Sequence, residues 1–529
     1  MKLKRILALW LLCMLLFSLC ACGEKPVSAA VFRIATPAEP DSLNPFCTEG
    51  GLTEEFFLLC YDSLWRRDEN GETVSDIAES WSLSSDSLTW TIRLREDVTF
   101  SDGEPLTAED VMFSYELLRH TDTLYSAYFE GISAIRCPDD YTVVIVTDYV
   151  KGDMTENPAP ILPKHIWSAY EFDPTAFDNA AMIGSGPFVY EAGSTEEGWR
   201  FRARSDYGGQ TPQVGEVFFV AYATETGAAR AIAAGEVDAS FGLTDVQLTT
   251  LESVPGVQLL QTILPGAECE ALVFNTREDR LFEDGTMRHI LEQCMDRAWF
   301  LAMSAGSTGQ TGSTFASPGT DWFLEGLAVT EYDLTAAQNA LIAAGYRDTD
   351  EDGILESVKT EEELSFVLYS SSQDTWAATA AAILTEALET VGISVKWVKT
   401  DDDISSVCTE KADWDACMFA WRSSEDATIA ASEFYDTVGG LSGWVSPSFE
   451  SGLEQLRTAM DVADIHTQGK SLQQLAYDDC PCVVLAYAAD VQAIRSDLWT
   501  GYEDIGARTG GLFATGERNI YMLVRETDK

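Results

Sequence analysis

Closely spaced carboxylates between Asp348 and Gly353 could bind a metal ion. The segment reads Asp-Thr-Asp-Glu-Asp-Gly, and alternating aspartates followed by glycine begin the calcium loop of an EF-hand. The twelfth position of such a loop should hold a bidentate glutamate, but here it is Lys359. Glu356 offers a carboxylate at another spacing. The residues therefore leave a calcium site open without predicting one.

Histidines and cysteines form no metal-binding pattern. There are four histidines, none in a CxxC or HExxH-like arrangement: His120, His165, His289 and His466. Nine cysteines follow Cys22 at irregular spacing, and an odd number permits no complete pairing. Cys60 and Cys417 stand in apolar runs where a buried free thiol is equally expected. We predict no metal site and no cofactor, and we assign no disulfide.

Local catalytic motifs are also missing from the sequence. There is no GxSxG elbow, no zinc-protease helix and no cysteine with an obvious histidine partner nearby. The glycine-rich segment Gly184-Ser-Gly-Pro187 lacks the spacing and the lysine of a phosphate-binding loop. Binding is therefore favoured over catalysis, and a nucleotide ligand is not expected.

Cys22 is the one cysteine for which the sequence predicts a covalent modification. Lys2, Lys4 and Arg5 precede an apolar run over residues 6–19, as in a signal peptide. The run is shorter than the roughly 20 residues that span a membrane. It ends in Leu19-Cys20-Ala21-Cys22, the pattern of a lipobox, whose cysteine is diacylated and becomes the first residue.

Cys20 is the weaker candidate for the acylated residue, because the residue before it, Leu19, is large for a cleavage site. We therefore predict a signal peptide over 1–21 and a lipid-anchored linker over 22–30, which is small and polar. Ordinary cleavage near Ala30 without a lipid is the alternative. Two acyl chains would give stable attachment, whereas one gives only marginal binding.

Composition predicts a large folded body with an acidic surface. Of the 529 residues, 46% are hydrophobic and 11% aromatic, enough for two to four domains. The formal net charge is -52, which would repel nucleic acid and anionic lipid headgroups. We therefore expect no nucleic-acid partner.

Apolar spacing indicates mixed α/β structure. Strands are expected over 88–94 and 141–147, where apolar and polar residues alternate or β-branched residues run together. Thr107 and Asp110 form a capping-box start for a helix. A second helix is expected over 287–301, and Gly345 and Gly392 stand where helices would end.

Several segments together resemble the extracellular solute-binding proteins of peptide ABC importers, family 5. The resemblance runs from about Phe32 to the C-terminus and keeps the family's order. Its blocks are AEPDSLNPF (38–46), SDGEPLTAED (101–110), ILPKHIW (161–167), IGSGPFVY (183–190), AIAAGEVD (231–238), LVFNT (272–276), MRHILEQCMDRAWF (287–300), DLTAAQNALIAAGYRDTDEDGILE (333–356) and WDACMFAWRSSEDA (414–427).

This resemblance implies an α/β, bilobal periplasmic-binding-protein-like fold with an extra domain. Mixed sheets would be flanked by helices, and a ligand cleft would lie between lobes that close about a hinge. Domain I would be discontinuous, over 31–64, 183–273 and 488–529. Domain II would cover 65–182 and domain III 274–487.

The function implied is ligand capture for an ABC importer, with no enzymatic activity. The chain would be a monomer on the outer face of the cytoplasmic membrane, or in the periplasm of a Gram-negative cell. It would deliver oligopeptides to a permease driven by an ATPase. The alternatives are a nickel complex, a sugar or a signalling peptide in the same fold, or an envelope enzyme or peptide-holding chaperone.

The resemblance also suggests ligand-binding residues after the strand that ends near Trp421. Relatives place an aspartate for the ligand ammonium shortly after a Gly-Trp pair, and here Ala420 replaces the glycine. Asp426 stands five residues after Trp421, a spacing seen in some relatives. Ser424 occupies the position that other relatives fill with aspartate. Further candidates are Arg422, Glu425, Asn275 and Tyr487.

Overall fold

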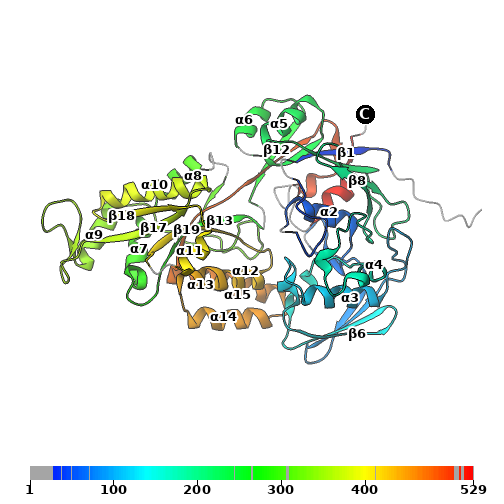
Figure 1. Ribbon diagram of the computed structural model, residues 1–529, viewed down its shortest axis with the longest axis horizontal. Coiled ribbons are helices and arrows are strands. Elements are labelled where there is room, and N and C mark those ends of the chain that lie inside the picture. Colours follow the sequence, from blue (N-terminus) through cyan, green and yellow to red (C-terminus); the bar gives the residue numbers. More distant parts are fainter. Residues whose placement is uncertain are drawn as a thin grey trace, which may run out of the picture.

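The computed structural model describes most of the chain. The described residues are 28–36, 39–48, 50–70, 72–243, 245–263, 266–304, 309–410, 413–505, 512–513 and 517–527. The predicted signal segment, with Cys20 and Cys22, lies outside them. The described part has a mixed α/β architecture in two lobes (Figure 1).

A seven-stranded sheet draws its strands from three separate parts of the chain. Its order is β12-β21-β11-β1-β10-β9-β8. β1 pairs in parallel with β10 and β11, and the other neighbours are antiparallel. The strands are β1 (Val31–Thr36), β8 (Phe188–Ser194), β9 (Gly198–Ala203), β10 (Glu216–Ala221), β11 (Ala239–Leu243), β12 (Val257–Thr262) and β21 (Asp490–Arg495).

A four-stranded antiparallel sheet lies in the same lobe (Figure 1). Its order is β4 (Ala78–Leu83), β5 (Thr89–Leu94), β7 (Thr142–Thr147) and β6 (Ile132–Asp139). Three two-stranded ribbons complete the strands of the two lobes. They are β2 (Trp65–Arg67) with β3 (Thr73–Ser75), β22 (Trp499–Thr500) with β23 (Arg525–Glu526), and, in the second lobe, β15 (Tyr346–Arg347) with β16 (Glu356–Ser357).

The second lobe is built on a six-stranded mixed sheet of order β14-β20-β13-β19-β17-β18. Its strands are β13 (Glu268–Phe274), β14 (Gln310–Thr311), β17 (Ser365–Ser371), β18 (Ser394–Thr400), β19 (Ala416–Arg422) and β20 (Cys482–Tyr487). β13 pairs only within this sheet among the described residues. The domain boundary expected at residue 273 therefore falls at the end of a strand of the second lobe.

Helices cover the sheets of both lobes (Figure 1). In the first lobe they are α2 (Leu52–Cys60), α3 (Ala108–Arg119), α4 (Lys164–Trp167), α5 (Glu225–Ala234), α6 (Asp245–Leu251) and α17 (Asn519–Leu523). In the second they are α7 (Gly285–Gln293), α8 (Arg297–Ser304), α9 (Leu334–Ala344), α10 (Thr375–Thr390), α11 (Ile404–Glu410), α12 (Ala427–Phe434), α13 (Gly440–Ser442), α14 (Pro447–Thr458) and α15 (Val462–Asp479).

Local patterns predicted several elements correctly. The expected strands are β5 and β7, which pair with each other. The capping box before α3 is confirmed, because Asp110 accepts hydrogen bonds from the Thr107 backbone N–H at 2.9 Å and from its hydroxyl at 3.0 Å. Gly345 ends α9 with φ 97°, a left-handed conformation that glycine adopts without strain.

The helix expected over 287–301 is broken into two. α7 ends at Gln293, and α8 begins at Arg297. Asp296 accepts a hydrogen bond from the Trp299 backbone N–H at 2.9 Å. An aspartate in that position satisfies a free donor of a new helix start. The apolar spacing continues across the break, and for this reason periodicity did not reveal it.

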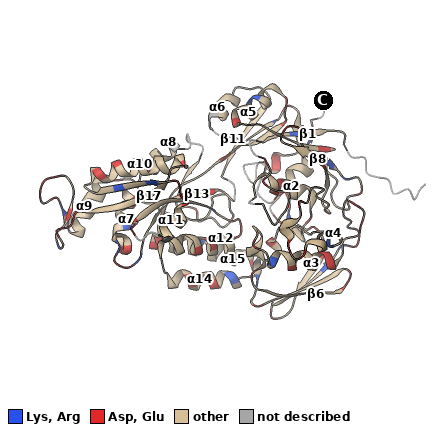
Figure 2. Ribbon diagram, in the orientation of Figure 1, with Lys and Arg blue, Asp and Glu red and all other residues tan. Residues whose placement is uncertain are grey.

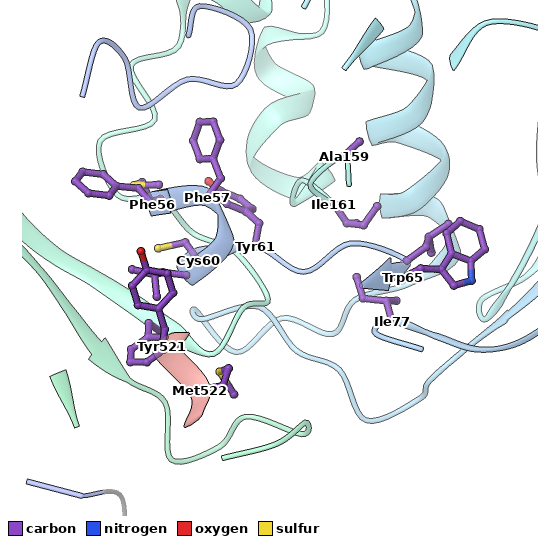
Figure 3. Packing of buried hydrophobic residues seen from close by; sticks show 14 of the residues in the cluster. Phe56, Phe57, Cys60, Tyr61, Trp65, Ile77, Ala159, Ile161, Tyr521 and Met522 are labelled. Carbon is purple, nitrogen blue, oxygen red and sulfur yellow. The ribbon is translucent and has the colours of Figure 1, made fainter. Parts of the chain in front are cut away.

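One apolar cluster joins the two sheets of the first lobe. It contains Phe32 of β1, Phe56 of α2, Trp90 of β5 and Tyr115 of α3, all almost fully buried. Figure 3 shows Phe56, Cys60 and Tyr61 at the end of α2, with Tyr521 beneath them and Trp65 and Ile77 farther along. Because buried apolar contacts run without interruption, these sheets should move as one body.

The second lobe has its own cores on the two faces of its sheet. One includes Leu272 and Phe274 with α7, α9 and α10. The other includes Trp414 and Cys417 with Phe434 and Phe449 of α12 and α14. Separate cores are the property that lets two lobes move against each other.

The chain passes between the lobes in two short crossings. One lies between Thr262 of β12 and Glu268 of β13, and the other between Tyr487 of β20 and Asp490 of β21 (Figure 1). Acidic positions occur on both lobes (Figure 2). The nine cysteines after Cys22 are all free thiols. In the part of the chain that the structure describes, no helix has the length and apolar character to cross a membrane.

Candidate ligand-binding site between the lobes

A cavity of about 880 Å³ lies beside the first crossing. The end of β12 in the first lobe forms one wall, through Gln261, Thr262 and Ile263. The opposite wall comes from the second lobe: Gly309, Gln310, Pro318, Gly319, Thr320, Asp321, Phe323, Leu324, Glu325 and Lys470. A volume of 300–1,000 Å³ is usual for small-molecule sites. Lining by both lobes means that a ligand here would contact both at once.

Charged groups of both signs stand at this cavity. Lys470 of α15 and Asp321 line it, and both lie close enough to His466 to affect that imidazole. Burial lowers the pKa of His466; Asp321 opposes the shift, whereas Lys470 and Arg67 add to it. The wall can therefore offer an ammonium and a carboxylate to a ligand that carries both charges.

Trp421 and Arg422 end the strand β19 and face opposite sides of the sheet. Trp421 is opposite Cys269, and Arg422 is opposite Glu268. The indole is half-buried and packs against the ring of Phe434, with centroids 5.7 Å apart. Trp421 also shares an apolar cluster with Phe323, which lines the cavity. The structure thus places Trp421 in the layer next to the cavity wall.

Asp426 is the N-cap residue of α12. Its Oδ1 accepts hydrogen bonds from the backbone N–H groups of Thr428 and Ile429, both at 2.8 Å, and the residue is 8% exposed. Ser424 supports it, because its hydroxyl accepts a hydrogen bond from the Asp426 backbone N–H at 3.2 Å. This arrangement satisfies free donors of the first helical turn. The Asp426 carboxylate therefore caps the N-terminus of α12.

Glu425 connects the second lobe with the first. Its carbonyl accepts a hydrogen bond from the indole N–H of Trp322 at 2.8 Å. Its carboxylate lies 3.9 Å from the guanidinium of Arg67, on β2 in the first lobe. Arg67 also bonds Glu156 at 2.8 Å. An ion pair between the lobes therefore stands directly before α12.

Carboxylates of both lobes lie around Arg422. Burial raises the pKa of Glu54 on α2, and Arg422 partly reverses that rise. Burial also raises the pKa of Glu268, and Arg422, its partner across the strand pair, partly reverses that rise. Since Glu54 belongs to the first lobe and Glu268 to the second, Arg422 interacts electrostatically with both.

Glu270 is a buried carboxylate next to this group. It is 8% exposed, and no hydrogen bond or ion pair to its carboxylate is found among the described residues. Burial, with smaller contributions from the negative charges of Glu268 and Asp374, raises its pKa to about 8. At neutral pH the folded protein therefore holds Glu270 largely protonated.

Tyr487 and Asn275 have structural partners. The buried Tyr487 hydroxyl accepts from the Thr314 backbone N–H and donates to the Thr314 carbonyl, each at 2.8 Å, which fixes the backbone at Thr314. Asn275 donates to the Trp414 carbonyl at 2.9 Å. β13 and β19 are antiparallel, so Asn275 lies at the opposite end of the strand pair from Trp421. The structure does not bring Asn275 to the other candidates.

Sequence reasoning did not find Phe323, Lys470 or Arg67. None of the seven predicted site residues is among the described residues that line the cavity. Phe323 and Lys470 lie far from Trp421 in the sequence, in segments that carry no motif. The N-cap role of Asp426 did have a sequence signal, because aspartate directly before an apolar helix is a common start.

Known proteins are similar to most of this chain. The family model described as bacterial extracellular solute-binding proteins, family 5 Middle, matches residues 72–442. The oligopeptide-binding protein AppA of Bacillus subtilis is 24% identical over 412 residues, which are 76% of this chain and 75% of that protein. The match thus covers the larger part of both chains.

Solved structures show the same fold. AppA of Bacillus subtilis in complex with a nonapeptide has a TM-score of 0.71 and 20% identity, covering 95% of this chain and 100% of that one. NikZ of Campylobacter jejuni in complex with Ni(L-His) has a TM-score of 0.72 and 20% identity, covering 93% and 99%. The two-lobed architecture is thus common to proteins solved with different ligands.

Proposed function

Because the chain belongs to family 5 of the bacterial extracellular solute-binding proteins, we propose that it captures oligopeptides between its lobes and delivers them to an ABC permease powered by an ATPase. The observation that carries this proposal is the cavity of about 880 Å³ with walls from both lobes. A ligand held there would favour the closed arrangement by contacting both lobes. The chain acts by binding alone, without catalysis.

The domains proposed from the resemblance need one change at a boundary. Domain I comprises about 31–64, 183–263 and 488–529, domain II 65–182, and domain III the residues from the first crossing to 487. The shift from 273 follows from β13, which pairs with β19 and β20. The two crossings, one between β12 and β13 and the other between β20 and β21, then form the hinge.

The N-terminal segment gives this receptor its place in the cell. After removal of residues 1–21, lipid on Cys22 and the linker 22–30 hold a monomer at the outer face of the cytoplasmic membrane, or in the periplasm. A tether of this kind raises the effective concentration of the receptor beside its permease.

Contacts to the peptide are assigned to the end of β19 and to the turn that follows it. Trp421 offers an aromatic wall beside Phe323, and Arg422 offers a cation to the ligand carboxylate. Ser424, Glu425 and Asp426 form the turn beside the loop 318–325, to which Trp322 connects it. Peptides are commonly held through main-chain hydrogen bonds, with charged side chains fixing the termini.

Mass spectrometry of the ligand that co-purifies with the full chain tests this function. A mixture of short peptides, released on unfolding, is the expected result. Binding should raise the melting temperature in proportion to the logarithm of peptide concentration. Recovery of a nickel complex or a sugar instead would keep the receptor but refute the peptide ligand.

Two substitutions at Asp426 separate its capping from ligand binding. Asp426→Asn keeps an N-cap acceptor and removes the charge, whereas Asp426→Ala removes both and should cost about 1 kcal/mol of stability. If the carboxylate binds the ligand ammonium, the Asn variant loses peptide affinity at wild-type stability. If Asp426→Asn binds peptide with wild-type affinity, the ligand ammonium is bound by another group.

A further inference from the structure

A histidine, a glutamate and a cysteine meet in the second lobe, away from the cavity between the lobes. They are His289 and Glu292 on α7, and Cys480 directly after α15. One possible ligand atom from each lies within 4.8 Å of the others. Glu292 and Cys480 are almost fully buried, whereas 43% of the His289 side chain is exposed. The group is thus accessible from one side only.

A hydrogen bond to a neighbouring carbonyl orients the His289 ring so that its Nδ1 faces Glu292. His289 Nε2 is 3.2 Å from the Asp478 carbonyl, an acceptor that holds the Nε2 proton, so Nδ1 is the ring nitrogen left for a metal ion that displaces its proton. That Nδ1 is 3.5 Å from Glu292 Oε2. A histidine that binds metal usually donates its other N–H to such a carbonyl, which fixes the ring.

Glu292 is held in the same way. Its Oε1 accepts hydrogen bonds from Arg297 at 2.8 Å and from the Tyr477 hydroxyl at 3.1 Å. The second oxygen, Oε2, is therefore the one directed at His289. Arg297 in turn donates to the Val484 carbonyl at 3.0 Å, which anchors the carboxylate to β20.

Cys480 occupies a backbone conformation that favours glycine. It caps α15 with φ 50° and ψ 52°, in the left-handed region. Glycine is the usual residue at this place after a helix. A cysteine here accepts backbone strain and brings its sulfur within 4.8 Å of the possible ligand atoms of His289 and Glu292. Strained positions of this kind often have a functional reason.

We propose that His289, Glu292 and Cys480 bind a divalent transition-metal ion of the Zn²⁺ type. Nitrogen, carboxylate oxygen and thiolate sulfur are the ligands that Zn²⁺ takes in proteins, and three of them leave a fourth position for water or solute. The exposed edge of His289 gives access to that position. The ion would join α7 to the end of α15, which Arg288 already connects through the Asp479 carbonyl at 2.8 Å.

Cobalt substitution tests this site. The full chain, purified in detergent, reduced and freed of metal, is titrated with Co²⁺. We expect one bound ion with a thiolate-to-cobalt charge-transfer band, displaced by Zn²⁺. Zn²⁺ should also raise the melting temperature. Absence of a thiolate band in the wild-type chain would refute the proposal.

Substitutions identify the thiolate. Cys480→Gly removes the sulfur and suits the left-handed backbone, so folding is preserved. This variant and His289→Gln should both lose the band and the shift in melting temperature. Cys482→Ser removes the nearest other thiol in sequence and should keep both. A band that persists in Cys480→Gly, or disappears in Cys482→Ser alone, would overturn the assignment.

Discussion

At the scale of single residues, Glu270 shows how burial changes a carboxylate. It stands on β13 with Glu268 two residues before it and Asp374 nearby, and both add to the effect of burial. A pKa of about 8 means that the folded state binds a proton which the unfolded chain releases near 4.5. Where the folded state binds more protons, stability falls as pH rises.

Glu270→Gln should remove this pH dependence. Below pH 4.5 both states are protonated, so the full stability is present; it decreases as pH rises toward 8. Each pKa unit corresponds to about 1.4 kcal/mol, so the variant should be more stable than wild type at pH 8 by on the order of a few kcal/mol. Near pH 5 the difference should be small. Urea unfolding at both pH values measures it.

Glu389→Gln, at an exposed position of α10, is the matched control for Glu270→Gln. It should alter stability by less than about 0.5 kcal/mol at either pH. A Glu270→Gln effect of equal size at pH 5 and pH 8 would argue against the raised pKa.

At the scale of elements, the turn between α14 and α15 touches the first lobe. A Cβ atom on Gly152 would lie 2.0 Å from the Ala459 carbonyl oxygen and 3.6 Å from Ile465. Gly152 belongs to the short 3₁₀ helix Gly152–Glu156, which also carries the Glu156 partner of Arg67. The absent side chain therefore permits a backbone contact between the lobes.

Gly152→Ala should weaken closure without unfolding either lobe. The added methyl group cannot fit against a backbone carbonyl, and overpacking of this kind costs roughly 1–3 kcal/mol. The lobes can relieve it by separating, so ligand affinity should fall about tenfold or more. Small-angle X-ray scattering should show a larger radius of gyration with ligand present.

Gly440→Ala provides the control for Gly152→Ala. Gly440 is exposed, and no atom lies within 4 Å of the position its Cβ would take. Affinity and radius of gyration should match wild type. Equal behaviour of the two variants would show that the contact at Ala459 does not limit closure.

At the scale of the whole molecule, a strongly acidic chain positions a few cations between its lobes. Arg67 approaches Glu425, and Arg422 interacts with Glu54 and Glu268. Burial lowers the pKa of Arg67, but Glu425 and Glu156 outweigh it, so the net pKa is raised. These arginines reduce the repulsion that the carboxylates of two closing lobes would otherwise feel.

Arg67→Gln should favour the open arrangement. Partly exposed ion pairs contribute about 0–1 kcal/mol, so ligand affinity should fall up to about fivefold, and less at high salt. Calorimetric titration with the recovered ligand measures the change. Arg202→Gln breaks a pair within one sheet, to Glu191 at 2.8 Å, and should leave affinity unaltered. A similar loss in both variants would indicate a general effect of charge.

The family and the fold class could be predicted from the amino-acid sequence alone. Nine blocks in a fixed order carried the resemblance, and local patterns predicted β5, β7, α3 and the end of α9 because these depend on neighbours in the chain. The break between α7 and α8 was missed, since the apolar spacing continues through it while Asp296 starts a new helix.

The residues that meet at the candidate site could not be predicted, because their proximity depends on the tertiary fold. The antiparallel register of β13 with β19 separates Asn275 from Trp421. Folding also brings Arg67 to Glu425, Phe323 to the cavity wall, and Cys480 to His289. None of these pairings leaves a periodic signal, because their partners come from distant segments whose approach is set by the packing of whole lobes.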